Sequence, residues 1–179
     1  MEYTAPVSIK IPKQRIAVLI GKNGEIKKRI EQLFKIRLDV TSFGDVTITT
    51  SDSLAALQAK DVVTAIARGF SPENALLLYS EENMLDVINL TDFIGKREKA
   101  LERLKSRIIG ARGKARFNIE ESTKTKISIY GKTVAIIGPH EGVALARTAI
   151  EKLISGKQHK AVYTFLNSKK TESPNGEDL

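Results

Sequence analysis

The pattern Gly-x-x-Gly, directly after an apolar residue, occurs at Ile20-Gly21-Lys22-Asn23-Gly24 and again at Ile109-Gly110-Ala111-Arg112-Gly113. Glycine carries no Cβ, so a ligand can approach the backbone closely at these positions. Each pattern opens a helix, and the free N–H groups of a first helical turn favour an anion. Basic side chains lie within or just after the loops, namely Lys22, Lys27, Lys28, Arg112, Lys114 and Arg116. The two stretches therefore predict two phosphate-binding loops. The alternative is a tight helix–turn–helix in which glycine serves only the turn.

The two loops belong to an internal repeat. A shift of 89 positions places Gly21 on Gly110 and Leu38 on Ile127, and after the second hairpin a shift of 88 places Ile48 on Ile136. Apolar periodicity predicts the same order in both copies: strand, short helix, glycine loop, helix, strand, strand, helix. The connection between first strand and loop is ten residues longer in the second copy. We assign that insertion to a basic helix.

The charge of the chain is concentrated. Its 179 residues carry 29 Lys and Arg against 21 Asp and Glu, a formal net charge of +8. Residues 96–116 hold nine basic and two acidic side chains, a local net charge of +7, whereas residues 71–95 hold five acids and no base. A basic surface of this density favours a polyanion, and nucleic acid is the first candidate.

Several classes of protein lack support in the sequence. The chain has no Cys, which excludes disulfides and thiolate zinc sites. No apolar run reaches the roughly 20 residues of a membrane span, and no signal peptide is recognisable, so we expect a cytoplasmic protein without a membrane partner. Neither a nucleotide-triphosphate loop nor a set of catalytic side chains occurs, so we expect no enzyme, no metal site and no cofactor.

These residues resemble the KH fold of RNA-binding proteins. The matching residues run from Ile11-Pro12 through the first loop to Leu38 and Val40, and from Ile108 through the second loop to Ile127 and Ile129. The resemblance implies that each loop clamps the backbone of about four unpaired nucleotides, whose bases lie in an apolar groove. The strand order resembles the eukaryotic-type, or type I, fold. We therefore expect an α+β protein of two type I KH domains, each a three-stranded sheet with three helices.

The resemblance assigns RNA-binding residues to each copy. The expected set is Ile20, Gly21, Lys22, Asn23, Gly24, Lys27, Lys28, Leu38 and Val40 in the first, and Arg107, Ile109, Gly110, Ala111, Arg112, Gly113, Lys114, Arg116, Ile127 and Ile129 in the second. We expect the second copy to bind RNA more tightly, because the basic stretch adjoins its loop.

The whole chain resembles a narrower family, the archaeal Dim-two proteins, which are counterparts of the eukaryotic partner-of-Nob-one factors. This resemblance implies a non-enzymatic ribosome assembly factor that binds the 3′ end of small-subunit (pre-)rRNA. It further implies two protein partners, the endonuclease Nob-one and the alpha subunit of translation initiation factor two. The alternatives are a general tandem-KH adaptor in RNA decay or translation, a nuclease that uses the same loops, and a protein adaptor whose KH folds are purely structural.

The expected boundaries follow the repeat. Residues 5–70 form the first KH domain and residues 71–82 a linker with a short helix. Residues 83–168 form the second KH domain, with the extended basic helix and a C-terminal helix. Residues 169–179 are expected to be a disordered tail, because they are polar and acidic.

Overall fold

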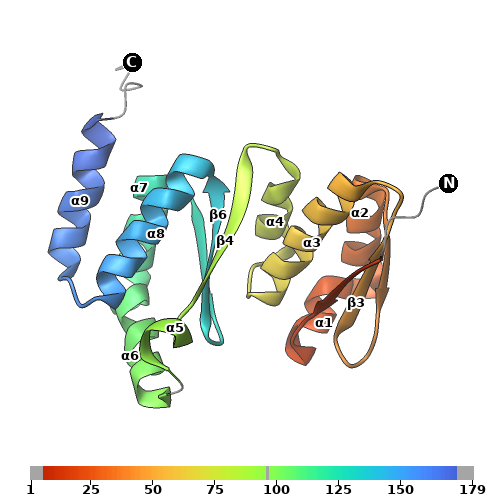
Figure 1. The fold of residues 1–179 in the computed structure, drawn as a ribbon, viewed down its shortest axis with the longest axis horizontal. Helices are drawn as coiled ribbons and strands as arrows, with labels where there is room; N and C mark the ends of the chain where they lie inside the picture. Colours follow the sequence, from red (N-terminus) through yellow and green to blue (C-terminus); the bar gives the residue numbers. More distant parts are fainter. Residues whose placement is uncertain (1–5, 96, 173–179) are drawn as a thin grey trace. The chain divides into compact units, whose positions relative to one another are not determined.

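The computed structural model describes residues 6–95 and 97–172, and side chains through Lys169. The chain divides after Glu81 into two compact units, drawn from red to yellow-green and from green to blue in Figure 1. The outer ends of the expected boundaries, residue 5 and residues 173–179, lie outside the described residues.

The first unit has the predicted order of elements. They are β1 (Val7–Lys10), α1 (Lys13–Ile20), the 3-10 turn η1 (Lys22–Gly24), α2 (Glu25–Phe34), β2 (Arg37–Val40), β3 (Asp45–Thr49) and α3 (Ser53–Ala67). The sheet is antiparallel in the order β1-β3-β2, with Val7 opposite Ile48 and Leu38 opposite the same residue. Leu19, Ile30 and Ile66 are fully buried. Alternating apolar residues of the strands thus meet the apolar stripes of the helices in one core.

The second unit repeats this arrangement. Its elements are β4 (Asn83–Asn89), α5 (Thr91–Ile94), α6 (Glu98–Ile109), η3 (Ala111–Gly113), α7 (Lys114–Thr123), β5 (Lys126–Tyr130), β6 (Thr133–Pro139), α8 (His140–Ile154) and α9 (His159–Glu172). The sheet is again antiparallel, in the order β4-β6-β5. Figure 1 shows α7 and α8 beside this sheet and α9 outside them. The α+β class and the type I order of both units are confirmed.

The insertion of the second copy is not one additional helix. Part of it lengthens α6, which has 12 residues where α1 has 8. The rest contains the short helix α5, between β4 and α6. Lys99, Arg103, Lys105 and Arg107 therefore lie on α6, the counterpart of α1, and Arg97 directly precedes it.

The segment expected as a linker packs on the first unit. It contains α4 (Pro72–Ala75) and the 3-10 turn η2 (Leu76–Tyr79), which pack against α3. Ser71 caps α4 by accepting a hydrogen bond from the N–H of Asn74 at 3.3 Å, as the Ser-Pro pattern predicts. Ala75 and Leu78 are buried, and the ring of Tyr79 meets that of Phe34 edge to face at 5.4 Å. Apolar burial explains why this segment is not an open connection.

The last helix differs from the sequence expectation. Helix α9 continues to Glu172, so residues 169–172 are helical, because Val162 and Leu166 anchor the helix in the core. Helix α3 is capped at its start by Asp52, whose carboxylate accepts hydrogen bonds from the N–H groups of Leu54 and Ala55.

Candidate nucleic-acid interface

The two glycine loops have the same backbone conformation. In the first loop φ is 74° at Gly21, 54° at Asn23 and 77° at Gly24, and the equivalent values in the second are 73°, 53° and 75°. All six residues thus lie at positive φ, which residues with a Cβ rarely adopt. Asparagine tolerates this region better than most residues, whereas Arg112 at the same place does not share that preference. The chain therefore forms the same strained loop twice.

The first glycine of each loop is required by packing. A Cβ on Gly21 would lie 2.5 Å from Cγ1 of Ile26, and a Cβ on Gly110 would lie 2.6 Å from Cβ of Ala115. These distances are far shorter than van der Waals contact. The first glycine therefore lets the two helices that flank each loop approach each other closely.

The second glycine of each loop faces open space. A Cβ on Gly24 would meet only Cε of Lys28, at 4.0 Å, and a Cβ on Gly113 would meet nothing within 4 Å. In these described loops no side chain caps the amino end of η1, η3, α2 or α7. Helix N-termini carry unpaired N–H groups and a partial positive charge, so an outside acceptor fits here. The second glycine leaves the approach to these amides clear.

The cations that surround the loops are accessible. Lys22, Lys28, Arg112 and Lys114 are exposed, as are Asn23 and Ala111 within the loops. Lys27 and Arg116 occupy equivalent positions, three residues after the second glycine, and each lies 3.7 Å from a carboxylate, that of Glu31 or Glu120. Such loose pairs leave the cations able to contact a phosphate.

These two glutamates also hold the edge strands, a role that sequence reasoning missed. Oε1 of Glu31 accepts a hydrogen bond from the N–H of Leu38 at 2.8 Å, and Oε1 of Glu120 accepts one from the N–H of Ile127 at 2.7 Å. Each carboxylate thereby connects the helix after the loop to the start of β2 or β5. The signal was present in the repeat, because Ile30-Glu31 aligns with Ile119-Glu120.

The expected groove residues separate into two groups. Leu38 and Ile127 are 0% and 4% exposed, near the start of β2 and β5, where Glu31 and Glu120 of the neighbouring helices accept hydrogen bonds from their N–H groups. They belong to the cores, which differs from the expectation that they contact bases. Val40 and Ile129 follow two residues later on the same face of each strand, and both are half-buried. Ile20 and Ile109, directly before the loops, are also half-buried.

Arg107, expected to bind RNA, is engaged within the second unit. Its guanidinium donates through Nε to the carbonyl of Leu153 at 2.8 Å and through Nη2 to the carbonyl of Lys157. The guanidinium of Arg15 makes equivalent hydrogen bonds in the first unit. Its Nε donates to the carbonyl of Ile66 at 2.7 Å and its Nη2 to the carbonyl of Phe70 at 2.5 Å. Both arginines thus cap the carboxyl end of a long helix, where the negative end of the helix dipole attracts a cation.

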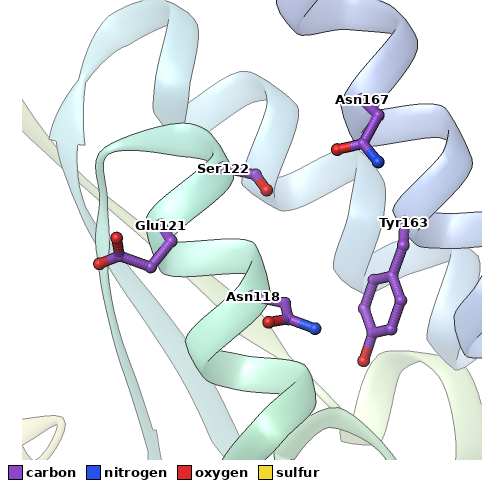
Figure 2. Close-up of a pocket in the computed structure, with 5 residues that line it drawn as sticks. All are labelled: Asn118, Glu121, Ser122, Tyr163 and Asn167. Carbon is purple, nitrogen blue, oxygen red and sulfur yellow. The ribbon is translucent and has the colours of Figure 1, made fainter.

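A polar pocket lies on the side of α7 that faces α9. Figure 2 shows Asn118 and Ser122 of α7 opposite Tyr163 and Asn167 of α9, with Glu121 at the margin. The pocket has a volume of about 320 Å³, and among the described side chains its lining is polar without a basic group. Asn118 and Ser122 replace Arg29 and Leu33 of the first copy. The presence of α9 in the second unit accounts for this difference.

Membrane spans and clustered metal ligands are both absent from the part of the chain that the structure describes. No helix among residues 6–95 and 97–172 is both long enough and apolar enough to cross a membrane. The same residues contain no group of three or more His, Asp or Glu side chains placed to hold a metal ion.

Known protein families match both units. A family described as eukaryotic-type KH domain (KH-domain type I) matches residues 84–171, and the KH domain family matches residues 6–65. A KH domain-containing protein of Methanocaldococcus jannaschii is 46% identical over 162 residues, which cover 88% of this chain and 71% of that protein.

Two further relatives are connected with ribosomal RNA. The pre-rRNA-processing protein PNO1 of Chaetomium thermophilum is 34% identical to this chain. The matched region covers 65% of this chain and 46% of PNO1, so this chain spans about half the length of that relative. The crystal structure of an a/eIF2alpha–aDim2p–rRNA complex from Pyrococcus horikoshii contains a chain that is 48% identical, with a TM-score of 0.88, covering 94% of this chain and 96% of that chain.

Proposed function

From the premise that this chain belongs to the family of KH-domain proteins that includes Dim2p and PNO1, we propose that it binds single-stranded RNA through its two glycine loops. The RNA is the 3′ end of small-subunit (pre-)rRNA, and the protein acts in ribosome biogenesis. Support for this proposal comes from the rRNA in the complex with aDim2p and from the pre-rRNA processing by PNO1.

One observation supports the RNA-binding role above the others. Both units present a glycine with open space beside it, at the uncapped start of a helix and next to exposed cations. Phosphate oxygens accept hydrogen bonds from the backbone N–H groups at the start of a helix, and a flexible unpaired strand can bring successive phosphates to the loop. The site residues that we propose are Ile20, Gly21, Lys22, Asn23, Gly24, Lys27, Lys28, Val40, Ile109, Gly110, Ala111, Arg112, Gly113, Lys114, Arg116 and Ile129.

We propose the second loop as the stronger of the two. Three exposed cations, Arg112, Lys114 and Arg116, lie in or just after it, and the exposed Arg103 lies on α6, which leads into it. The basic stretch contributes less than its charge count suggests, because Arg107 caps α8 and Lys105 pairs with Glu102 at 3.0 Å.

The protein partners are part of the proposal. The aDim2p of Pyrococcus horikoshii forms its complex with a/eIF2alpha, the alpha subunit of initiation factor two, and we propose that subunit as a partner of this chain as well. The endonuclease Nob-one, implied by the family resemblance, is a second proposed partner. The cytoplasm is the proposed location, and the proposed role is binding without catalysis.

Crosslinking to RNA in cells, followed by sequencing of the attached fragments, tests the proposed substrate. Fragments from the 3′ end of small-subunit rRNA support it, whereas fragments spread over messenger RNAs favour the general tandem-KH adaptor. Competition in vitro between rRNA 3′-end oligonucleotides and scrambled oligonucleotides checks the same preference with purified protein. Incubation of RNA with the protein and Mg²⁺ tests the nuclease alternative, and we expect intact RNA.

A further inference from the structure

The turn between β2 and β3 is unusually well fixed for a surface hairpin. Thr41 and Asp45 bond to each other three times, through backbone N–H to carbonyl at 2.9 Å and through the threonine hydroxyl at 3.1 and 3.2 Å. The N–H of Ile11 donates to the carbonyl of Gly44 at 2.8 Å, and Lys10 pairs with Asp45 at 2.7 Å. A Cβ on Gly44 would lie 2.3 Å from the carbonyl oxygen of Ile11. The turn is therefore held against the end of β1.

This fixed turn presents an aromatic side chain to solvent. Phe43 is 66% exposed, the largest exposed fraction among the exposed large apolar side chains of the described residues. The ammonium of Lys13, itself exposed, lies 5.5 Å from the centroid of its ring. The ring on this fixed turn offers one aromatic face to solvent with a cation beside it, and a nucleobase with its adjoining phosphate can use both.

Phe43 lies at one end of the proposed RNA groove of the first unit. Lys13 begins α1, and the first glycine loop follows directly after the last residue of the same helix. A helix of eight residues spans about 12 Å. Val40, the half-buried residue at the end of β2, directly precedes the turn and lies three positions before Phe43. An unpaired strand held at the loop and running along α1 therefore reaches the ring of Phe43.

We propose that Phe43 and Lys13 form a stacking site for one nucleobase of single-stranded RNA, outside the segment that the first glycine loop clamps. The inference rests on the proposed RNA-binding function and adds a contact that lengthens the bound segment. An aromatic face accepts any base, and the lysine provides a cation for the adjoining phosphate. The hairpin of the second unit differs, because it turns at Gly131 and Lys132 and its nearest aromatic residue, Tyr130, belongs to β5 and not to the turn. The two units therefore bind RNA segments of different length.

The chain contains no tryptophan, so Phe43→Trp introduces a single reporter at the site. The experiment uses the full chain with Gly113→Asp, which weakens binding at the second loop so that the first loop carries most of it. We expect an oligonucleotide of about eight nucleotides to quench the fluorescence of Phe43→Trp, and one of about four nucleotides to bind with little quenching. The matched control is Phe93→Trp, a replacement of a phenylalanine on α5, 48% exposed and outside both proposed loops, which should not respond.

Affinity gives an independent readout. In the Gly113→Asp background, Phe43→Ala should weaken binding of the longer oligonucleotide about tenfold and leave the shorter one unchanged, and Phe43→Tyr should retain affinity. Saturable binding of the longer RNA without quenching, or with full affinity in Phe43→Ala, overturns the stacking site and leaves the RNA-binding function standing. Wild-type affinity for both oligonucleotides after Gly24→Asp in the same background overturns the proposed function itself.

Discussion

The two glycines of one loop should fail in different ways when they are replaced. Gly110→Ala places a Cβ 2.6 Å from Cβ of Ala115 and 2.8 Å from its backbone N, so α6 and α7 must separate. Gly113→Asp meets nothing within 4 Å. Its conformational cost is that of a left-handed residue, about 1 kcal/mol for aspartate, which tolerates this region. The first variant should therefore lose stability, whereas the second should remain folded.

The effect of Gly113→Asp on RNA binding follows from charge. A carboxylate about 4 Å from a phosphate costs about 1 kcal/mol in a water-like environment and about 4 kcal/mol at an effective dielectric constant of 20. The loop is exposed, so we expect a loss of binding free energy of about 2 kcal/mol, which corresponds to a roughly 30-fold higher Kd. Blocking the approach of the phosphate adds to this loss.

Fluorescence anisotropy with a labelled single-stranded RNA measures the Kd, and urea unfolding measures the free energy of unfolding. Gly113→Asn is the matched control, because it has nearly the same shape and no charge, so its Kd should fall between those of the wild type and Gly113→Asp. The phosphate site at this loop is disproved if Gly113→Asp unfolds cooperatively, with no more than the loss of about 1 kcal/mol expected for its backbone conformation, and still binds RNA with wild-type affinity.

Three other outcomes follow from the structure. Arg107→Ala should lower the free energy of unfolding, measured in urea, by about 2 kcal/mol, because two charged hydrogen bonds to the end of α8 are lost. The control Arg112→Ala removes the same charge from an exposed side chain and should not show this loss. Equal stability of the two variants would contradict the capping role. Burial raises the pKa of the Asp61 carboxyl, so its charged form destabilises the fold above that pKa. Asp61→Asn should therefore raise the Tm at about pH 7. An increase in Tm that does not become smaller as the pH falls toward about 4 would contradict this explanation. The logarithm of the RNA association constant should fall linearly with the logarithm of salt concentration, and Lys114→Ala should reduce the slope by roughly 0.7; an unchanged slope would show that Lys114 contacts no phosphate.

The order of helices and strands could be predicted because each element is determined by residues that are close together in the sequence. Alternation in the strands, spacing in the helices and the glycines at turns each involve a few neighbouring residues. The loops were predictable for the same reason, because two glycines and the basic residues beside them lie within a few positions of one another. The repeat then strengthened each assignment, because the same signals occur in the same order twice.

What failed depends on contacts between distant residues. Leu38 and Val40 have the same pattern in the sequence, yet only Leu38 is completely covered, at the start of β2 where Glu31 of α2 accepts a hydrogen bond from its N–H. Arg107 looked like one more cation of a basic helix, but the carbonyl groups that it binds are 46 and 50 residues away. No local pattern shows whether a side chain of this kind has a partner inside the fold.

The proposed mode of binding requires that backbone amides at the two loops receive the phosphates of an unpaired RNA strand. Amide chemical shifts, followed by NMR while a short single-stranded RNA is added, report on these groups themselves. We predict that the largest changes occur at residues 22–25 and 111–114 and that Gly24→Asp and Gly113→Asp each abolish the changes at their own loop only. Saturable binding that leaves both loops unperturbed and shifts amides elsewhere would show that the phosphates bind at another surface.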